Sequence, residues 1–155
     1  MEKTLQIQIP KGFKIEDFDI NSGIIKFTTE SIIERIKSID DAINELGEDD
    51  EDVKALRVIE NLSIPKHIIS QLQSIIIAKA LNEVWVPDWN DSSQYKYFPY
   101  FDMESSSAGG FVCNDYGSRG TYVAVGSRLC FKSRELAEYA GKQFKDIYEE
   151  YYVIK

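Results

Sequence analysis

The sequence predicts a single α+β domain over residues 1–155, because different apolar spacings follow one another along the chain. Near the N-terminus apolar and polar residues alternate, which is the period of a half-buried strand. Through the middle they recur every three or four residues, which is the period of an amphipathic helix. The predicted order is an N-terminal β-hairpin (1–30), a helical part (31–82), an aromatic antiparallel β-meander (84–132) and a C-terminal helix (133–152).

The N-terminal hairpin is predicted from two strand-like segments. In residues 4–10 the apolar and polar side chains alternate as Leu5, Gln6, Ile7, Gln8 and Ile9, and Pro10 ends the strand. The second strand is expected at residues 24–28. Because a polar stretch separates the two segments, the hairpin is expected to have a long connection.

The helical part begins with a predicted cap. Ser31 followed by Glu34 is a capping box, and apolar residues then recur at helical spacing as far as Leu46. This pattern predicts one amphipathic helix of about four turns that ends near Gly47. The five acids at 48–52 are interpreted as a solvated linker whose charges also favour the start of the next helix.

Two further helices are predicted in this part. One short helix presents an apolar face of Val53, Leu56, Ile59 and Leu62. Pro65 is expected in the first turn of the next helix, which runs to Leu81. This segment is the most apolar of the helical segments, so we expect it to be the central helix.

The meander is predicted from short strand-like segments. The first covers residues 95–101, where Pro99 indicates an edge strand or a bulge. Residues 105–110 form a predicted flexible turn. Further strands are expected at 109–113 and 121–125, joined by a turn at 114–117, and at 128–131. Ser133 then caps the C-terminal helix.

Composition excludes several classes of protein. The chain has 18 Lys and Arg against 26 Asp and Glu, a formal net charge of −8, which disfavours general nucleic-acid binding. No apolar stretch approaches the ~18 residues that a membrane span needs. The first residues have no apolar signal region, so we expect a cytoplasmic protein. Cys113 and Cys130 are expected to be reduced thiols in the core.

The sequence contains no catalytic or metal-binding signature. His67 is the single histidine, and we interpret it as a partly exposed residue in the first turn of a helix. One histidine and two cysteines do not provide the ligand pairs of a zinc site. Glycine-rich phosphate motifs are also missing. We therefore predict no cofactor and no metal, and favour a protein that is not an enzyme.

The aromatic segment is the strongest candidate for a binding surface, with seven aromatic residues between Trp85 and Phe101. Alternation places Tyr95, Tyr97 and Pro99 on one face of the strand, and Phe98 and Tyr100 on the other. One interpretation is a well-packed aromatic sheet face. The other is a pocket or partner surface, because Trp and Tyr are preferred anchors of interfaces. Its candidate binding residues are Trp85, Trp89, Tyr95 and Tyr97.

A small group of cations in the same half of the chain extends this candidate site. Its members are Arg119, Arg128, Lys132 and Arg134. Cations beside the start of a helix suit a phosphate or carboxylate group. Together with stacking aromatic residues they suit a small nucleotide-like ligand rather than a polymer. The alternative is that they are ordinary solvated side chains.

Several motifs resemble a group of small, mostly uncharacterised proteins carried by phages, prophages and mobile elements of gut anaerobic bacteria. These motifs are LNE at 81–83, Trp85, PDWN at 87–90, KYFPYFDM at 96–103 and the run at 125–144. Residues 5–13 also resemble the N-terminal hairpin of that group. The resemblance implies a mobile-element origin and a bacterial cytoplasm. It implies no activity and no catalytic residues.

These observations lead to three functional hypotheses. The first is a non-enzymatic phage or mobile-element protein that binds a host or phage protein partner through the aromatic segment. The second is a sponge that sequesters a nucleotide-derived defence signal. The third is a structural component of a virion. A homo-oligomer is also possible, since exposed aromatic strands and sheet edges favour self-association.

Overall fold

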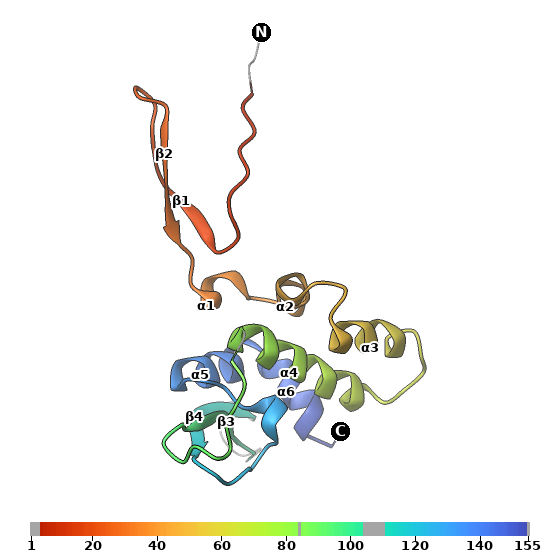
Figure 1. Ribbon diagram of the computed structural model, residues 1–155. Helices are drawn as coiled ribbons and strands as arrows, with labels where there is room; N and C mark the ends of the chain where they lie inside the picture. Colours follow the sequence, from red (N-terminus) through yellow and green to blue (C-terminus); the bar gives the residue numbers. More distant parts are fainter. Residues whose placement is uncertain (1–3, 84, 104–110, 155) are drawn as a thin grey trace. The chain divides into compact units, whose positions relative to one another are not determined.

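The computed structural model describes residues 4–83, 85–103 and 111–154, and it confirms the α+β architecture (Figure 1). The chain divides into two compact units, Met1–Arg35 and Ile36–Lys155. The first contains the N-terminal hairpin and a short helix. The second contains the other described helices and a second pair of strands. No helix in the described part of the chain is both long enough and apolar enough to cross a membrane.

The first unit pairs β1 (Phe13–Asp19) with β2 (Ile24–Thr29) as an antiparallel hairpin. The hairpin was predicted, but its predicted first strand was wrong. Residues 4–10 have extended, alternating chemistry and yet pair with no other described residue. Alternation records only which side chains are apolar, and does not show whether a neighbouring strand is in reach.

The predicted long connection of the hairpin was also wrong, because the polar stretch before Gly23 builds a tight turn. The Asp19 carboxylate accepts hydrogen bonds from the Asn21 backbone N–H at 2.9 Å and from the Ser22 hydroxyl at 2.6 Å. The N–H of Gly23 then donates to the Asp19 carbonyl at 2.8 Å. Gly23 has a φ of 71°, which glycine adopts without steric cost.

The predicted cap at Ser31 is confirmed, but the helix after it is short. The Glu34 N–H donates to the Ser31 hydroxyl, and the Ser31 N–H donates to the Glu34 carboxylate. Helix α1 (Ile32–Arg35) ends after four residues, and α2 (Ile39–Leu46) starts a new helix. The prediction of one continuous helix was wrong because Ser38 and its box partner Asp41 begin α2 independently.

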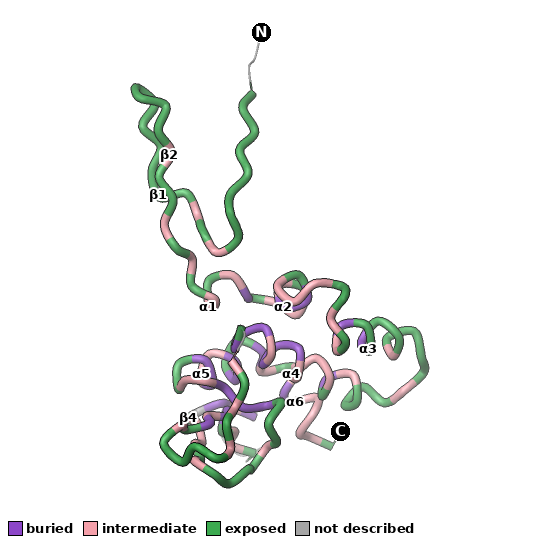
Figure 2. Tube along the Cα trace, in the orientation of Figure 1, coloured by how far each residue is buried: buried purple, intermediate pink, exposed green. Residues whose placement is uncertain are grey.

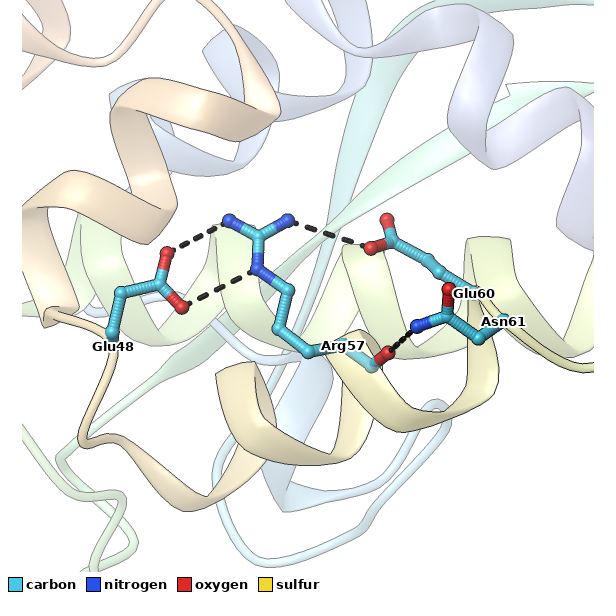
Figure 3. Close-up of polar contacts among 4 residues, drawn as sticks. All are labelled: Glu48, Arg57, Glu60 and Asn61. Carbon is cyan, nitrogen blue, oxygen red and sulfur yellow. Dashed lines mark hydrogen bonds and ion pairs between the residues drawn. The ribbon is translucent and has the colours of Figure 1, made fainter.

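The acidic run at 48–52 connects α2 to α3 (Glu51–Ile59), and its last three residues cap and begin that helix, as predicted. The Asp50 carboxylate caps α3 by accepting the N–H groups of Asp52 and Val53. Glu48 forms an ion pair with Arg57, at 2.8 Å between Oε1 and Nη2. Figure 3 shows Arg57 between Glu48 and Glu60, with the Asn61 amide donating to the Arg57 carbonyl.

Helix α4 (Lys66–Asn82) follows Pro65 and is the central helix of the second unit, as predicted. It contacts α2 and α3 and, from the C-terminal part of the chain, α5 (Arg134–Gln143) and α6 (Lys145–Tyr152). Its C-terminal half is almost wholly buried (Figure 2). His67 lies exposed in its first turn, as expected.

The second sheet consists of β3 (Lys96–Asp102) and β4 (Val112–Arg119), which pair antiparallel with a bulge after Tyr100. Phe131 adds one further bridge to Tyr97. The predicted turn at 114–117 was wrong, since these residues continue β4. Gly117 is needed there for packing, because a Cβ atom on it would lie 2.2 Å from the Phe98 ring.

Three other predictions for the second half need correction. Residues 121–125 do not form a strand. Of the strand expected at 128–131, Arg128 and Leu129 belong to a 3-10 turn, η1 (Ser127–Leu129), and Phe131 alone forms a β-bridge. The C-terminal helix is two helices, because Phe144 leaves the helical region at φ −109° and ψ 29°. The turn expected at 105–110 lies outside the described residues. Ser133 caps α5 as predicted, by accepting the Leu136 N–H.

The Asn82 side chain joins the end of α4 to the segment between the sheet and α5. Its amide nitrogen donates to the Cys130 carbonyl at 2.7 Å, and its amide oxygen accepts the Lys132 N–H at 2.9 Å. Between these two residues, Phe131 exchanges both of its backbone hydrogen bonds with Tyr97 of β3. Asn82 therefore forms hydrogen bonds with the backbone groups on the side of this segment that faces away from β3, as the backbone of a neighbouring strand would.

We expect Asn82→Ala to lower the free energy of unfolding by about 2–3 kcal/mol, because it leaves two backbone groups without partners. Urea unfolding followed by circular dichroism measures this change. The control is Asn61→Ala, which removes an exposed amide–carbonyl bond to Arg57 and is expected to cost no more than about 0.5 kcal/mol. Equal effects of the two substitutions would contradict the role assigned to Asn82.

Candidate functional site

The aromatic segment after α4 folds around a buried lysine that was not among the predicted site residues. Lys96 is 1% exposed, and its ammonium donates to the backbone carbonyls of Asp88 and Asp91. The same ammonium lies 5.3 Å from the ring centre of Trp89, a cation–π distance. Trp89 in turn donates its indole N–H to the Ser127 hydroxyl at 2.9 Å. Trp89 thus makes internal contacts on both its face and its edge.

The two predicted tyrosines belong to an aromatic group on the sheet. The Tyr97 ring lies 5.6 Å from that of Tyr116 in β4 and 6.5 Å from that of Tyr95, which is half exposed. The guanidinium of Arg134 lies 4.7 Å from the Tyr116 ring. These contacts support the interpretation of a packed sheet face for Tyr97 and leave Tyr95 at its margin.

The four predicted cations are not gathered into one cluster. Lys132 forms an ion pair with Glu83 at 2.6 Å, and Arg134 forms one with Glu138 at 2.7 Å. The hydrogen bond that Arg134 donates to the Glu138 carboxylate raises the pKa of Arg134. Arg119 donates to the carbonyl of its neighbour Ser118. Two of the four charges are therefore already balanced by acids.

Arg128 and Trp85 are the two predicted residues that share a hollow. This Trp85 hollow has a volume of about 300 Å³, and its lining includes Lys79, Asn82 and Ser127. Its size is at the lower end of the range for ligand pockets. Arg128 is exposed and forms no ion pair or hydrogen bond with any residue that the structure describes.

Lys79, which also lines the Trp85 hollow, belongs to an ion-pair network. The Lys79 ammonium lies 2.7 Å from Asp50 and 2.8 Å from Asp52. Burial of Asp50 raises its pKa, but the hydrogen bonds from Lys79 and from the start of α3 outweigh burial, so the net pKa is lowered. Lys79 is therefore neutralised by the protein itself, and Arg128 is the one cation of the lining without an acid partner among the described residues.

The two cysteines are buried, free thiols, as expected. Burial raises the pKa of Cys130 to about 11 and also raises the pKa of Cys113. A thiol with so high a pKa is a poor nucleophile at neutral pH. The described residues contain no group of three or more His, Cys, Asp and Glu arranged to hold a metal ion.

A second candidate surface lies on the N-terminal hairpin and was missed by sequence reasoning. Cross-strand partners share a face of a sheet, and the pairs Ile15 with Phe27 and Phe18 with Ile25 follow Phe13 along one face. We call these five side chains the apolar hairpin face. The other face is polar: Lys14 is opposite Thr28, and Asp17 forms an ion pair with Lys26 at 3.5 Å.

A β-bulge produces the apolar hairpin face. Phe13 and Ile15 are two residues apart, but Phe18 follows Ile15 by three, which would point it to the other side of a regular strand. The bulge between Ile15 and Asp17 inserts one residue into β1 and returns Phe18 to the apolar side. The sequence signal for this face is the spacing of the apolar residues. They are two and then three residues apart in β1 (Phe13, Ile15, Phe18), whereas Ile25 and Phe27 in β2 are two apart.

The apolar hairpin face is uncovered. Phe13, Ile15, Phe18 and Phe27 are 38–55% exposed, and none of the described hairpin residues is buried (Figure 2).

No family model matches the chain, and comparison with curated proteins and with solved structures finds no match. The Trp85 hollow and the apolar hairpin face are the two candidate functional surfaces on the described part of the chain.

We expect Lys79→Met to lower the free energy of unfolding by about 0.5–1 kcal/mol at neutral pH, since Asp50 loses a partly exposed ion pair. The lowered pKa of Asp50 stabilises the fold above the ordinary carboxyl pKa, and this contribution disappears as pH falls through the lowered value. The difference between variant and wild type should therefore shrink in acid.

Urea unfolding at a series of pH values measures the difference. The control is Lys54→Met, whose exposed pair with Asp49 should contribute nothing measurable at any pH. A Lys79→Met effect of constant size from neutral to acidic pH would contradict the assignment.

Proposed function

We propose that this protein is a non-enzymatic accessory protein of a phage or mobile element that binds a host or phage protein in the bacterial cytoplasm. The observation that carries the proposal is the apolar hairpin face. Three phenylalanines and two isoleucines line one side of a two-stranded sheet, and four of these side chains are 38–55% exposed. A contiguous exposed apolar patch with a polar surround is typical of a protein-binding surface.

The energetics of a two-stranded sheet support a partner. An isolated hairpin is marginally stable in water and needs a third strand or a packed face. This hairpin has paired charges on its other face, between Asp17 and Lys26 and between Lys14 and Glu34. The pair with Lys14 lowers the pKa of Glu34 to about 2. The polar face is thus suited to water and the apolar face to contact with a protein.

The aromatic segment is a weaker candidate for the partner surface than the sequence indicated. Trp89 and Tyr97 make their contacts within the second unit, with Lys96 and Tyr116. We therefore place the proposed partner surface on the hairpin. The mobile-element origin rests on the resemblance of the motifs at 81–103 and 125–144, and the cytoplasmic location rests on the same resemblance.

Site-specific photocrosslinking in the bacterial host tests the proposal. We expect Phe18→p-benzoylphenylalanine to give one defined adduct with another protein, because Phe18 lies in the apolar hairpin face. The same residue in place of Tyr122, a highly exposed side chain of the second unit, is the matched control. The adduct should disappear when Phe27→Ser is added. Adducts of equal yield at both positions, or none at position 18, would overturn the proposal.

A second candidate function is capture of a small nucleotide-like ligand in the Trp85 hollow. It is favoured by one observation, the unpaired Arg128 beside an aromatic ring in a hollow of about 300 Å³. Because Glu51 and Asp52 also line the hollow, a ligand with few negative charges fits better than a polyphosphate.

For this second function we expect Arg128→Gln to weaken binding of cyclic dinucleotides or nucleoside monophosphates at least about tenfold, since it removes a charge-assisted hydrogen bond. Isothermal titration calorimetry measures the affinity. Arg119→Gln, which changes an exposed arginine outside the hollow, should leave it unchanged. Absence of heat with the wild-type protein, or equal affinities for all three proteins, would exclude the ligand function.

A further inference from the structure

The segment before the hairpin has the chemistry of a strand but no partner in its own unit. Leu5, Ile7 and Ile9 alternate with glutamines, and these three apolar side chains are 40–82% exposed. Residues 4–9 form no hydrogen bond with any described residue. An amphipathic strand with free backbone groups is a template for pairing with a sheet edge.

The turn at Lys11 and Gly12 keeps this segment away from the free edge of its own β1. The Phe13 N–H donates to the Pro10 carbonyl at 3.1 Å, which closes a two-residue turn. Gly12 has a φ of 82°, and Lys11 is not among the residues with positive φ. A positive φ at the third position alone defines a type II turn, and such turns splay the flanking strands instead of pairing them.

The same turn keeps the segment from the outer edge of its own β2. A β-turn holds the Cα atoms of Pro10 and Phe13 within about 7 Å of each other. The outer side of β2 lies two inter-strand spacings from β1, roughly 9.6 Å. The turn therefore holds Pro10 short of that edge, and residues 4–9 do not pair with β2 of their own chain.

The edge of β2 is suited to receive such a strand from another molecule. It is regular over its six residues, whereas the bulge disrupts the edge of β1. Residues 4–9 match β2 in length, and Pro10, which has no N–H, falls where pairing would end. If Leu5, Ile7 and Ile9 of the added strand lie on the same side as Ile25 and Phe27 of β2, the added strand continues the apolar hairpin face.

We infer that residues 4–10 of one molecule add as a third strand to the β2 edge of a second copy of this chain, in a reciprocal two-fold exchange. The complementary strand and edge are both present in one chain, so the exchange closes with two copies. Residues 1–35 carry a net charge of only −1 out of −8 for the whole chain, so the two exchanging regions do not repel each other.

The exchange gives each hairpin the third strand that a stable sheet needs. It also adds Leu5, Ile7 and Ile9 to the apolar hairpin face, and so presents two enlarged faces on one dimer. This inference rests on the proposed function, because the enlarged face is the surface to which the partner protein would bind.

Sedimentation velocity and native mass spectrometry of the purified full chain test the inference. We expect a dimer at micromolar concentration, and we expect Ile7→Pro to weaken it at least about tenfold, because proline removes an N–H from the added strand. Since residues 4–9 make no hydrogen bond with any described residue, this variant should retain the wild-type circular dichroism of the second unit. Ile20→Ser, which removes an even more exposed apolar side chain of the hairpin turn (80% against 40% for Ile7), is the control and should leave the dimer intact.

Phe13→Ser separates this inference from the proposed function. Phe13 lies in the apolar hairpin face on β1 and not on the β2 edge, so Phe13→Ser should leave the dimer intact while abolishing the crosslink that p-benzoylphenylalanine at position 18 makes to the partner protein. A monomer at all concentrations, or a dimer unaffected by Ile7→Pro, would overturn the strand exchange and leave the partner crosslink standing. Absence of any crosslink from position 18 in the chain without the added substitution, together with an Ile7→Pro-sensitive dimer, would overturn the proposed function alone.

Discussion

The side-chain amide of Asn82 is the interaction on which the second unit depends, because it holds the segment at 130–132 between α4 and β3. One amide donates to Cys130 and accepts from Lys132, while Phe131 pairs with Tyr97 in the opposite direction. Successive residues of an extended segment direct their backbone groups to opposite sides. The Asn82 side chain therefore bonds the two backbone groups on the side of this segment that faces away from β3, and it connects the segment to the end of the central helix.

Two lysines of the second unit are already bound by other groups of the protein, so their charges are not available to an anionic ligand. Lys96 is buried under Trp89 and bound to loop carbonyls, and Lys79 is held by Asp50 and Asp52. A cation that is already desolvated and paired gains little from a further anion. Four of the predicted binding residues make their contacts within the second unit, namely Trp89, Tyr97, Lys132 and Arg134, whereas Trp85 and Arg128 line the hollow.

The N-terminal unit differs from the second unit. It has an apolar face on its hairpin, but none of its described residues is buried. Its bulge keeps Phe18 in line with Ile15, and its turn chemistry from Asp19 to Gly23 sets the register. Both features order a surface that the described residues of the unit do not cover. This exposed apolar surface is the basis of the proposed contact with another molecule.

Short-range signals in the sequence determined the fold class, the caps at Ser31 and Ser133, the start of the helix after Pro65 and the exposed position of His67, because each depends on residues a few positions apart. The sequence also determined the acidic charge and the buried character of both cysteines. Only the tertiary structure decided that Gly117 lies in a strand under Phe98, that Lys132 pairs with Glu83, and that Asn82 bonds to Cys130. These outcomes join residues such as Lys132 and Glu83, 49 positions apart in the sequence, whose approach no local pattern encodes.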